Sequence, residues 1–134
     1  MMCMRLFAPA LAVVVIASGC GGGDRPSSGA RPSSTAAISI IEPEHNATID
    51  TDTLTVRTEL TGGTISSEVS TNLTPDEGHV HVKIDGKTLT LNSGLEEEID
   101  APEPGSHLLE VEFVASDHGP FNPRVLDTIT FEVT

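Results

Sequence analysis

Residues 79–85 read HVHVKID, and this stretch decides the fold class. Val80, Val82 and Ile84 alternate with polar residues, which is the period of two that a strand with one buried face requires. The Asp-Gly pair after Ile84 is typical of a two-residue hairpin turn. We therefore expect a half-buried β-strand whose core face consists of these three apolar residues.

The same alternation recurs on both sides of this stretch. It covers segments 38–40, 53–60, 79–85, 88–91, 95–99, 108–113 and 128–133. Thr, Val and Ile dominate these segments, Gly, Pro, Asn and Asp separate them, and no later window shows a helical period. The sequence therefore predicts an all-β domain over residues 36–134. We expect an antiparallel β-sandwich of about seven strands, immunoglobulin-like or fibronectin-III-like in build.

Composition excludes several classes of function. The chain has 134 residues, of which 20 are acidic and 7 basic, for a formal charge of −13. Such a surface repels phosphate, so we expect no nucleic-acid partner. Aromatic residues make up 3 %, without Trp or Tyr, which argues against stacking platforms for sugars or bases. No sequence motif marks a nucleophile or a phosphate loop, and we expect no catalytic activity.

The N-terminal segment 1–19 resembles the signal peptide of a bacterial lipoprotein. Residues 6–17 form an apolar run of secretory length that is too short to span a bilayer as a helix. The motif Ala17-Ser18-Gly19-Cys20 resembles a lipobox. The resemblance implies that Cys20 becomes the mature N-terminus and carries diacylglycerol and an acyl chain such as palmitate, a stable membrane anchor. The alternative is a secreted protein that is cleaved elsewhere and keeps a free thiol.

Residues 20–35 are rich in Gly, Ser and Pro and contain no apolar residue larger than Ala. Such a segment cannot bury enough surface to fold, so we expect a flexible tether between the anchor and the domain. Cys3 lies in the signal segment, and we expect no disulfide in the mature chain. Together these features predict a lipid-anchored protein of the cell envelope whose domain lies outside the cytoplasm. Gly21 favours the outer membrane where two membranes exist.

His79 and His81 are the residues with the clearest chemical interest. They lie two apart on one strand, so both side chains project from the face opposite the core, about 6–7 Å apart. On a solvent-exposed face, two such imidazoles can share one divalent metal ion. Cu(II) or Zn(II) suits this chemistry better than Mg(II) or Ca(II). The alternative is a structural role, in which the histidines pair with nearby carboxylates.

A third metal ligand has to come from another segment. In an immunoglobulin-like sandwich the strand at 79–85 pairs with the strand at 107–115, so the loop at 116–124 reaches the same rim. That loop carries His118, and Glu110 and Glu112 lie beside the two histidines on the paired strand. The sequence does not distinguish between the two glutamates. The candidate metal ligands are His79, His81, His118 and Glu112.

Two further segments allow more than one interpretation. His107 lies at the opposite end of its strand, and the alternation of the strand places its side chain on the core face. We therefore expect a hydrogen-bonded histidine at the strand end and not a metal ligand. The connection from Thr61 to Gly78 is long for a β-domain, as functional loops often are. Its residues 65–69 fit a short edge strand equally well.

Three stretches of the domain resemble a recurring type of bacterial lipoprotein or periplasmic domain. They are GHVHVKIDG at 78–86, PGSHLLEVEFV at 104–114 and SDHGPFNP at 116–123. The resemblance implies an immunoglobulin-like fold and carries no activity with it. The sequence thus predicts a non-catalytic binding or accessory module for an envelope protein or a small ligand. The alternatives are a Cu(II)- or Zn(II)-binding lipoprotein and a passive structural protein of the envelope.

Overall fold

The computed structural model describes residues 30–134, except for the side chains of 91–93. Every regular element in this part is a strand: β1 (Ala37–Glu42), β2 (Thr48–Ile49), β3 (Thr53–Thr61), β4 (Thr64–Ile65), β5 (Glu77–Ile84), β6 (Lys87–Ser93), β7 (Glu96–Asp100), β8 (Gly105–Ala115) and β9 (Pro120–Val133). No helix that could cross a membrane occurs within residues 30–134. The predicted signal segment and the lipid-attachment residue Cys20 lie outside the described residues.

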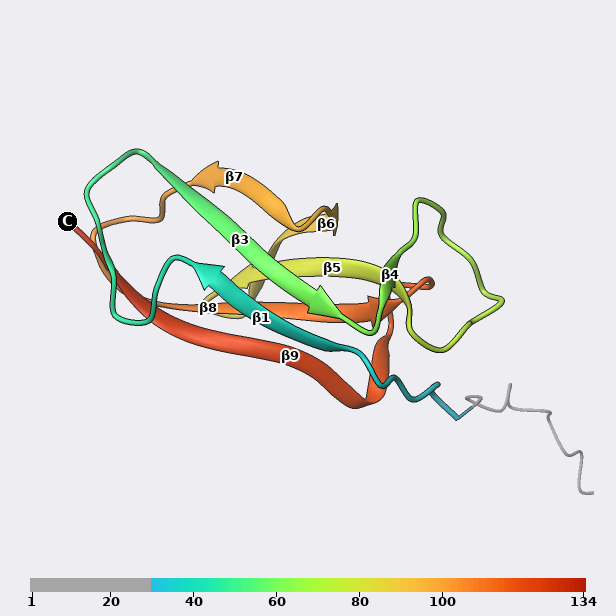
Figure 1. Cartoon of the computed structure of the whole chain (residues 1–134). Coiled ribbons are helices and arrows are strands. Elements are labelled where there is room, and N and C mark those ends of the chain that lie inside the picture. The colour runs from blue at the N-terminus through green and yellow to red at the C-terminus, as the bar shows by residue number, and fades with distance from the viewer. Residues whose placement is uncertain (1–29) are drawn as a thin grey trace, which may run out of the picture.

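The strands form two facing sheets (Figure 1). One is a three-stranded antiparallel sheet in the order β1-β3-β7. The other has six strands, in the order β2-β9-β8-β5-β4 with β6 also paired to β5. The all-β sandwich predicted from the sequence is confirmed, and the seven longer strands fall on the seven expected segments. β2 and β4 are two-residue additions at the sheet edges.

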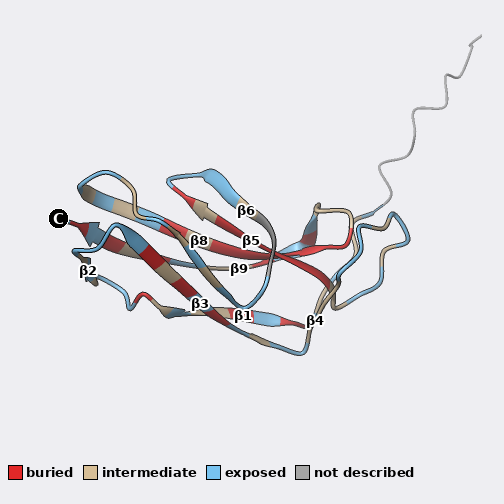
Figure 2. Cartoon of the chain, turned by 90° about the horizontal axis from the view of Figure 1, so that it is seen from above, coloured by how far each residue is buried: buried red, intermediate tan, exposed pale blue. Residues whose placement is uncertain are grey.

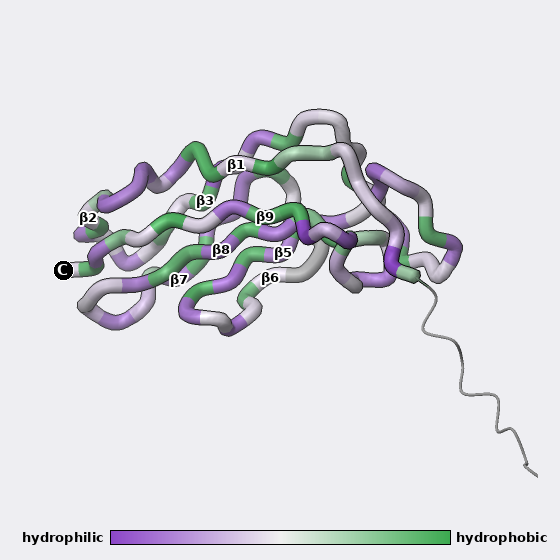
Figure 3. The backbone as a smooth tube through the Cα atoms, turned by 90° about the horizontal axis from the view of Figure 1, so that it is seen from below, coloured by the Kyte–Doolittle hydropathy of each residue, from purple (hydrophilic) through white to green (hydrophobic). Residues whose placement is uncertain are grey.

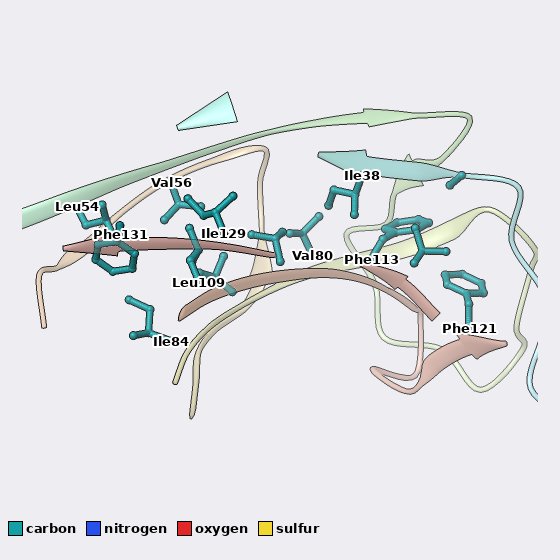
Figure 4. Packing of buried hydrophobic residues seen from close by; sticks show 14 of the residues in the cluster. Ile38, Leu54, Val56, Val80, Ile84, Leu109, Phe113, Phe121, Ile129 and Phe131 are labelled. Atoms are coloured by element: carbon teal, nitrogen blue, oxygen red, sulfur yellow. The ribbon is translucent and has the colours of Figure 1, made fainter. Parts of the chain in front are cut away.

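The hydrophobic core lies between the two sheets (Figures 2 and 4). Figure 3 shows how hydrophobic and hydrophilic residues alternate along β8 and β9. The alternation predicted for β5 is confirmed, because its three apolar residues are all buried. The largest fully buried core side chains are Phe113, Phe121, Phe131, Leu54 and Leu109. Burial of each such side chain contributes about 1.5–3 kcal/mol before the entropy of folding is counted.

Turn and edge chemistry agrees with the local sequence. Asp85 (φ 51°) and Gly86 (φ 80°) connect β5 to β6 in the left-handed conformation that an Asp-Gly hairpin turn favours. β7, which contains the acidic run at 96–98, lies at the edge of the three-stranded sheet. Charged side chains at such an edge oppose pairing with other chains. In the long connection, Thr64–Ile65 pairs with β5 as a two-residue strand, shorter than the expected 65–69.

The loop expected at 116–124 is shorter in the structure. β9 begins at Pro120, and a four-residue turn at 116–119 joins it to β8. The register shifts at this end, because Phe113 pairs with Val125 whereas Val114 pairs with Pro120. The intervening residues bulge from the ladder, and Phe121 among them turns into the core with 1 % exposure. Burial of this ring explains why the segment joins the sheet rather than remaining a loop.

Candidate functional site

Strands β5 and β8 bring the candidate site residues side by side. In their antiparallel register His81 lies opposite Glu112, and His79 lies opposite Val114. Directly opposed residues share a face of the sheet, and this face is the one turned away from the core. The predicted pairing of the two strands and the shared orientation of the two histidines are therefore confirmed.

The expected exposure of this face is wrong. His79 is 0 % exposed and His81 only 7 %, although both lie on the outer side of the six-stranded sheet. The turn at 116–119 folds back over them and places the ring of His118 against both. The alternation of a strand shows which face a residue occupies, but it does not reveal that a distant turn covers that face.

His118 is the centre of a three-histidine cluster, formed with His79 and His81. Its ring lies face to face with that of His79, at a centroid separation of 4.5 Å and an interplanar angle of 15°. The rings of His81 and His118 are 5.2 Å apart and inclined by only 18°. His81 Nε2 and His118 Nδ1 are separated by 2.9 Å. The distance between the two ring centroids exceeds the distance between the two facing nitrogens by about one ring width. The two rings therefore meet edge to edge and share one N–H···N hydrogen bond.

The hydrogen bonding of His79 is incomplete. Its Nε2 lies 3.3 Å from the carbonyl oxygen of Ser116. A carbonyl oxygen only accepts, so Nε2 carries the hydrogen and Nδ1 keeps its lone pair. Among the described side chains, those of residues 30–90 and 94–134, His79 Nδ1 is the one fully buried polar atom without a partner. Unpaired polar atoms that are buried in this way are rare in native proteins and cost stability.

The electrostatic surroundings keep His81 neutral near neutral pH. Burial lowers the pKa of His81, and the nearby His118 and Lys83 lower it further, whereas Glu112 acts in the opposite direction. Removal from water penalises the charged imidazolium more than the neutral ring. A neutral imidazole has one free lone pair, which is what a hydrogen-bond donor or a metal ion requires.

Glu112 belongs to an ion-pair cluster and not to the histidines. Its carboxylate oxygens accept hydrogen bonds from Lys83 Nζ at 2.7 Å and from Nε and Nη2 of Arg124, both at 2.7 Å. Lys83 and Arg124 also donate to Glu110. Burial alone would raise the pKa of Glu112, but the hydrogen bonds from Arg124 and Lys83 hold it below its ordinary value. Because Lys83 and Arg124 already bind its carboxylate, Glu112 is not a candidate metal ligand. The alternation of side chains along the strand correctly predicted that Glu112 lies beside His81, but it does not reveal which residues bind the carboxylate.

Residues 31–35, assigned to the tether in the sequence analysis, bind the domain. The guanidinium of Arg31 forms a two-pronged pair with Asp117, at 2.6 and 2.8 Å, and donates to the Pro120 carbonyl at 2.7 Å. Asp76 accepts hydrogen bonds from the Ser34 hydroxyl and from the backbone of the next two residues. We call residues 31–35 the N-terminal strap. Their Ser- and Pro-rich composition gave no signal of these contacts, because the partners lie in distant loops.

The strap acts directly on the turn that carries His118. The Arg31 hydrogen bond is the main cause that lowers the pKa of Asp117 to about 2. A Cβ on Gly119 would lie 2.6 Å from the guanidinium, so the glycine allows Arg31 to lie flat against the turn. The amide of Ser70, in the long connection, donates to the Ser116 carbonyl at 3.0 Å. The turn at 116–119 is therefore held both by the N-terminal strap and by the long connection.

The remaining described histidines have ordinary partners. His107 Nδ1 lies 2.7 Å from an oxygen of Asp85, and Nε2 lies 2.7 Å from the Glu103 carbonyl. The hydrogen bond to Asp85 raises the pKa of His107, as expected for a hydrogen-bonded strand-end histidine. His45 accepts a long hydrogen bond from the Thr130 amide. Both lie outside the three-histidine cluster.

The chain is similar to several solved structures. The chain is similar to fibronectin(III)-like modules of Clostridium thermocellum CbhA, with 17 % identity, coverage of 72 % of this chain and 96 % of that one, and a TM-score of 0.49. It is also similar to the endo-beta-1,4-mannanase from Thermotoga petrophila, with 18 % identity, coverage of 74 % of this chain and 20 % of that one, and a TM-score of 0.50. A third similar structure is CopC from Methylosinus trichosporium OB3b, with 19 % identity, coverage of 73 % of this chain and 92 % of that one, and a TM-score of 0.39. The chain thus spans one fifth of that mannanase.

These similarities concern the fold alone, because the identities are all below 20 %. No protein family matches the chain by sequence, and no curated protein does. Within residues 30–134, no three His, Cys, Asp or Glu side chains are already arranged to hold a metal ion.

Proposed function

We propose that this chain is a lipid-anchored, extracytoplasmic accessory module that carries out no catalysis and binds its ligand at the three-histidine cluster. The observation that supports this proposal is the unpaired Nδ1 of the fully buried His79. Leaving a buried polar atom unpaired costs about 1–3 kcal/mol. A protein retains such a cost where the group serves a ligand, whereas a purely structural core would be more stable with an apolar side chain.

The N-terminal strap gives this end of the domain a defined relation to the predicted anchor. The chain enters the described part at residue 30, and Arg31 is bound at once to Asp117 beside His118. A chain attached through Cys20 therefore presents the cluster at the end nearest its point of attachment. Radiolabelled palmitate should enter the wild-type protein in living cells. It should be absent from Cys20→Ala, and equal labelling of the two would exclude lipid attachment at this residue.

The stability of a His79 variant separates a binding site from a structural histidine. His79→Leu removes the unpaired nitrogen and the long 3.3 Å hydrogen bond to the Ser116 carbonyl, which still accepts from the Ser70 amide, and it keeps a side chain of similar volume. For a binding site, we expect the full mature chain in detergent to unfold at an equal or higher temperature than the wild type. The matched control is His107→Leu, which removes two good hydrogen bonds and should destabilise the domain by about 1–3 kcal/mol.

The opposite result would favour a passive structural protein of the envelope. If His79→Leu lowers the midpoint of thermal unfolding as much as His107→Leu, the His79 ring contributes to folding and the cluster needs no ligand. Circular dichroism in the far ultraviolet measures both midpoints.

A further inference from the structure

We propose that the three-histidine cluster binds one Cu(II) ion, through His79 Nδ1, His81 Nε2 and His118 Nδ1. This inference rests on the proposed function, because it names the ligand of the same site.

The first ligand nitrogen is already prepared. His79 donates through Nε2 to the Ser116 carbonyl, which fixes the tautomer with the lone pair on Nδ1. Metal-binding histidines typically donate their second nitrogen to a carbonyl or carboxylate in this way. Because Nδ1 is buried and has no partner, a metal ion that reaches it displaces no protein hydrogen bond.

The second and third ligand nitrogens already lie side by side. A given set of nitrogen ligands binds Cu(II) more tightly than Zn(II), so three imidazoles favour Cu(II). His81 Nε2 and His118 Nδ1 are separated by 2.9 Å. Each imidazole can carry its N–H on the nitrogen that does not face the other ring, which leaves one lone pair on each facing nitrogen for an ion.

The charges around the cluster do not oppose a cation. Lys83 and Arg124 lie on the same face of the sheet, but Glu110 and Glu112 neutralise both. Beyond this cluster, the formal charge of the whole chain is −13, which favours the approach of a cation over long range. The same excess of carboxylates also binds metal ions loosely elsewhere, so the test needs histidine controls.

Binding requires a small movement, and the fold provides the element that makes it. The resting rings of His81 and His118 point at each other, so each must tilt before both lone pairs meet at one ion. His118 lies on a four-residue turn at φ 62°, and its side chain is not buried. The hydrogen bonds that hold this turn are made by Asp117 and Ser116 and not by the His118 side chain, so the His118 ring, which is less buried than His81, can rotate without breaking them.

The experiment is a titration of the full mature chain, in detergent, with Cu(II) and separately with Zn(II). Isothermal titration calorimetry should give one Cu(II) per chain, and electron paramagnetic resonance should show nitrogen hyperfine coupling from imidazole. His81→Gln and His118→Gln should each weaken Cu(II) binding at least roughly tenfold. The controls His45→Gln and His107→Gln keep the cluster intact and should bind within about twofold of the wild type.

Three results would overturn the inference. They are the absence of stoichiometric Cu(II) binding, equal affinity in cluster and control variants, or tighter binding of Zn(II) than of Cu(II). None of these depends on the stability of His79→Leu. A stabilised His79→Leu variant together with absent Cu(II) binding would therefore retain the proposed binding module and reject only the metal. If His79→Leu is destabilised as much as His107→Leu, the proposed binding function of the three-histidine cluster is rejected as well.

Discussion

Gly78 is the position at which the histidine-bearing strand leaves no room for a side chain. It lies opposite Ala115 in the β5–β8 ladder. A Cβ there would overlap the carbonyl oxygen of Val114 and lie 2.8 Å from the carbonyl carbon of the same residue. Both are backbone atoms, so rotation of a side chain cannot relieve the overlap. Gly78→Ala must therefore move β5 and β8 apart at the end where His79 and the covering turn lie.

The size of this effect follows from the kind of atoms displaced. Overpacking a core by a methyl group costs about 1–3 kcal/mol, and here a central ladder must also lose hydrogen bonds. We predict that Gly78→Ala lowers the free energy of unfolding by about 3 kcal/mol or more. For a domain of this size that corresponds to a fall of roughly 12–24 °C in the midpoint of thermal unfolding, measured by circular dichroism on the full chain.

Gly94→Ala is the matched control, because the nearest atom to its added Cβ is the Glu96 carbonyl oxygen at 4.0 Å. We expect this variant to stay within about 0.5 kcal/mol of the wild type. A Gly78→Ala protein as stable as this control would refute the close approach of the two strands.

Two further predictions concern ion pairs. Arg124→Ala leaves the 4 %-exposed Glu112 carboxylate with one cation instead of two, and should cost about 2–3 kcal/mol in urea unfolding, whereas the exposed Arg57→Ala should cost less than about 1. Because the pKa of Asp117 falls from 3.8 to about 2, its pair with Arg31 stabilises the fold fully above about pH 4 and is lost toward pH 2. Arg31→Ala should therefore lose about 1 kcal/mol at neutral pH and little at pH 2, and an equal loss at both would contradict this pairing.

The sequence predicted those parts of the fold that depend on local periodicity. The alternation of Val80, Val82 and Ile84 fixed the core face of β5, and with it the shared face of His79 and His81. The Asp-Gly pair gave the hairpin turn. Each of these features is set by neighbouring residues in one strand, so no knowledge of the rest of the chain was needed.

The features that the sequence did not predict depend on contacts between distant segments. The burial of His79 requires the turn at 116–119 to fold over the sheet, and that in turn requires Phe121 to enter the core. Glu112 was chosen as a ligand because its parity is correct, yet Lys83 and Arg124 occupy its oxygens. Periodicity gives the face of a residue, whereas partners and cover depend on register and bulges.

The contact between Arg31 and Asp117 also determines where a leash would act on the domain. For a chain held through Cys20, the pivot of the tethered domain is Arg31, six residues before β1 begins at Ala37. Figure 1 shows the C-terminus at the far end of the sandwich from this point. With the proposed attachment through Cys20, rotation about this contact would move Thr134 the farthest and would keep the three histidines near the membrane.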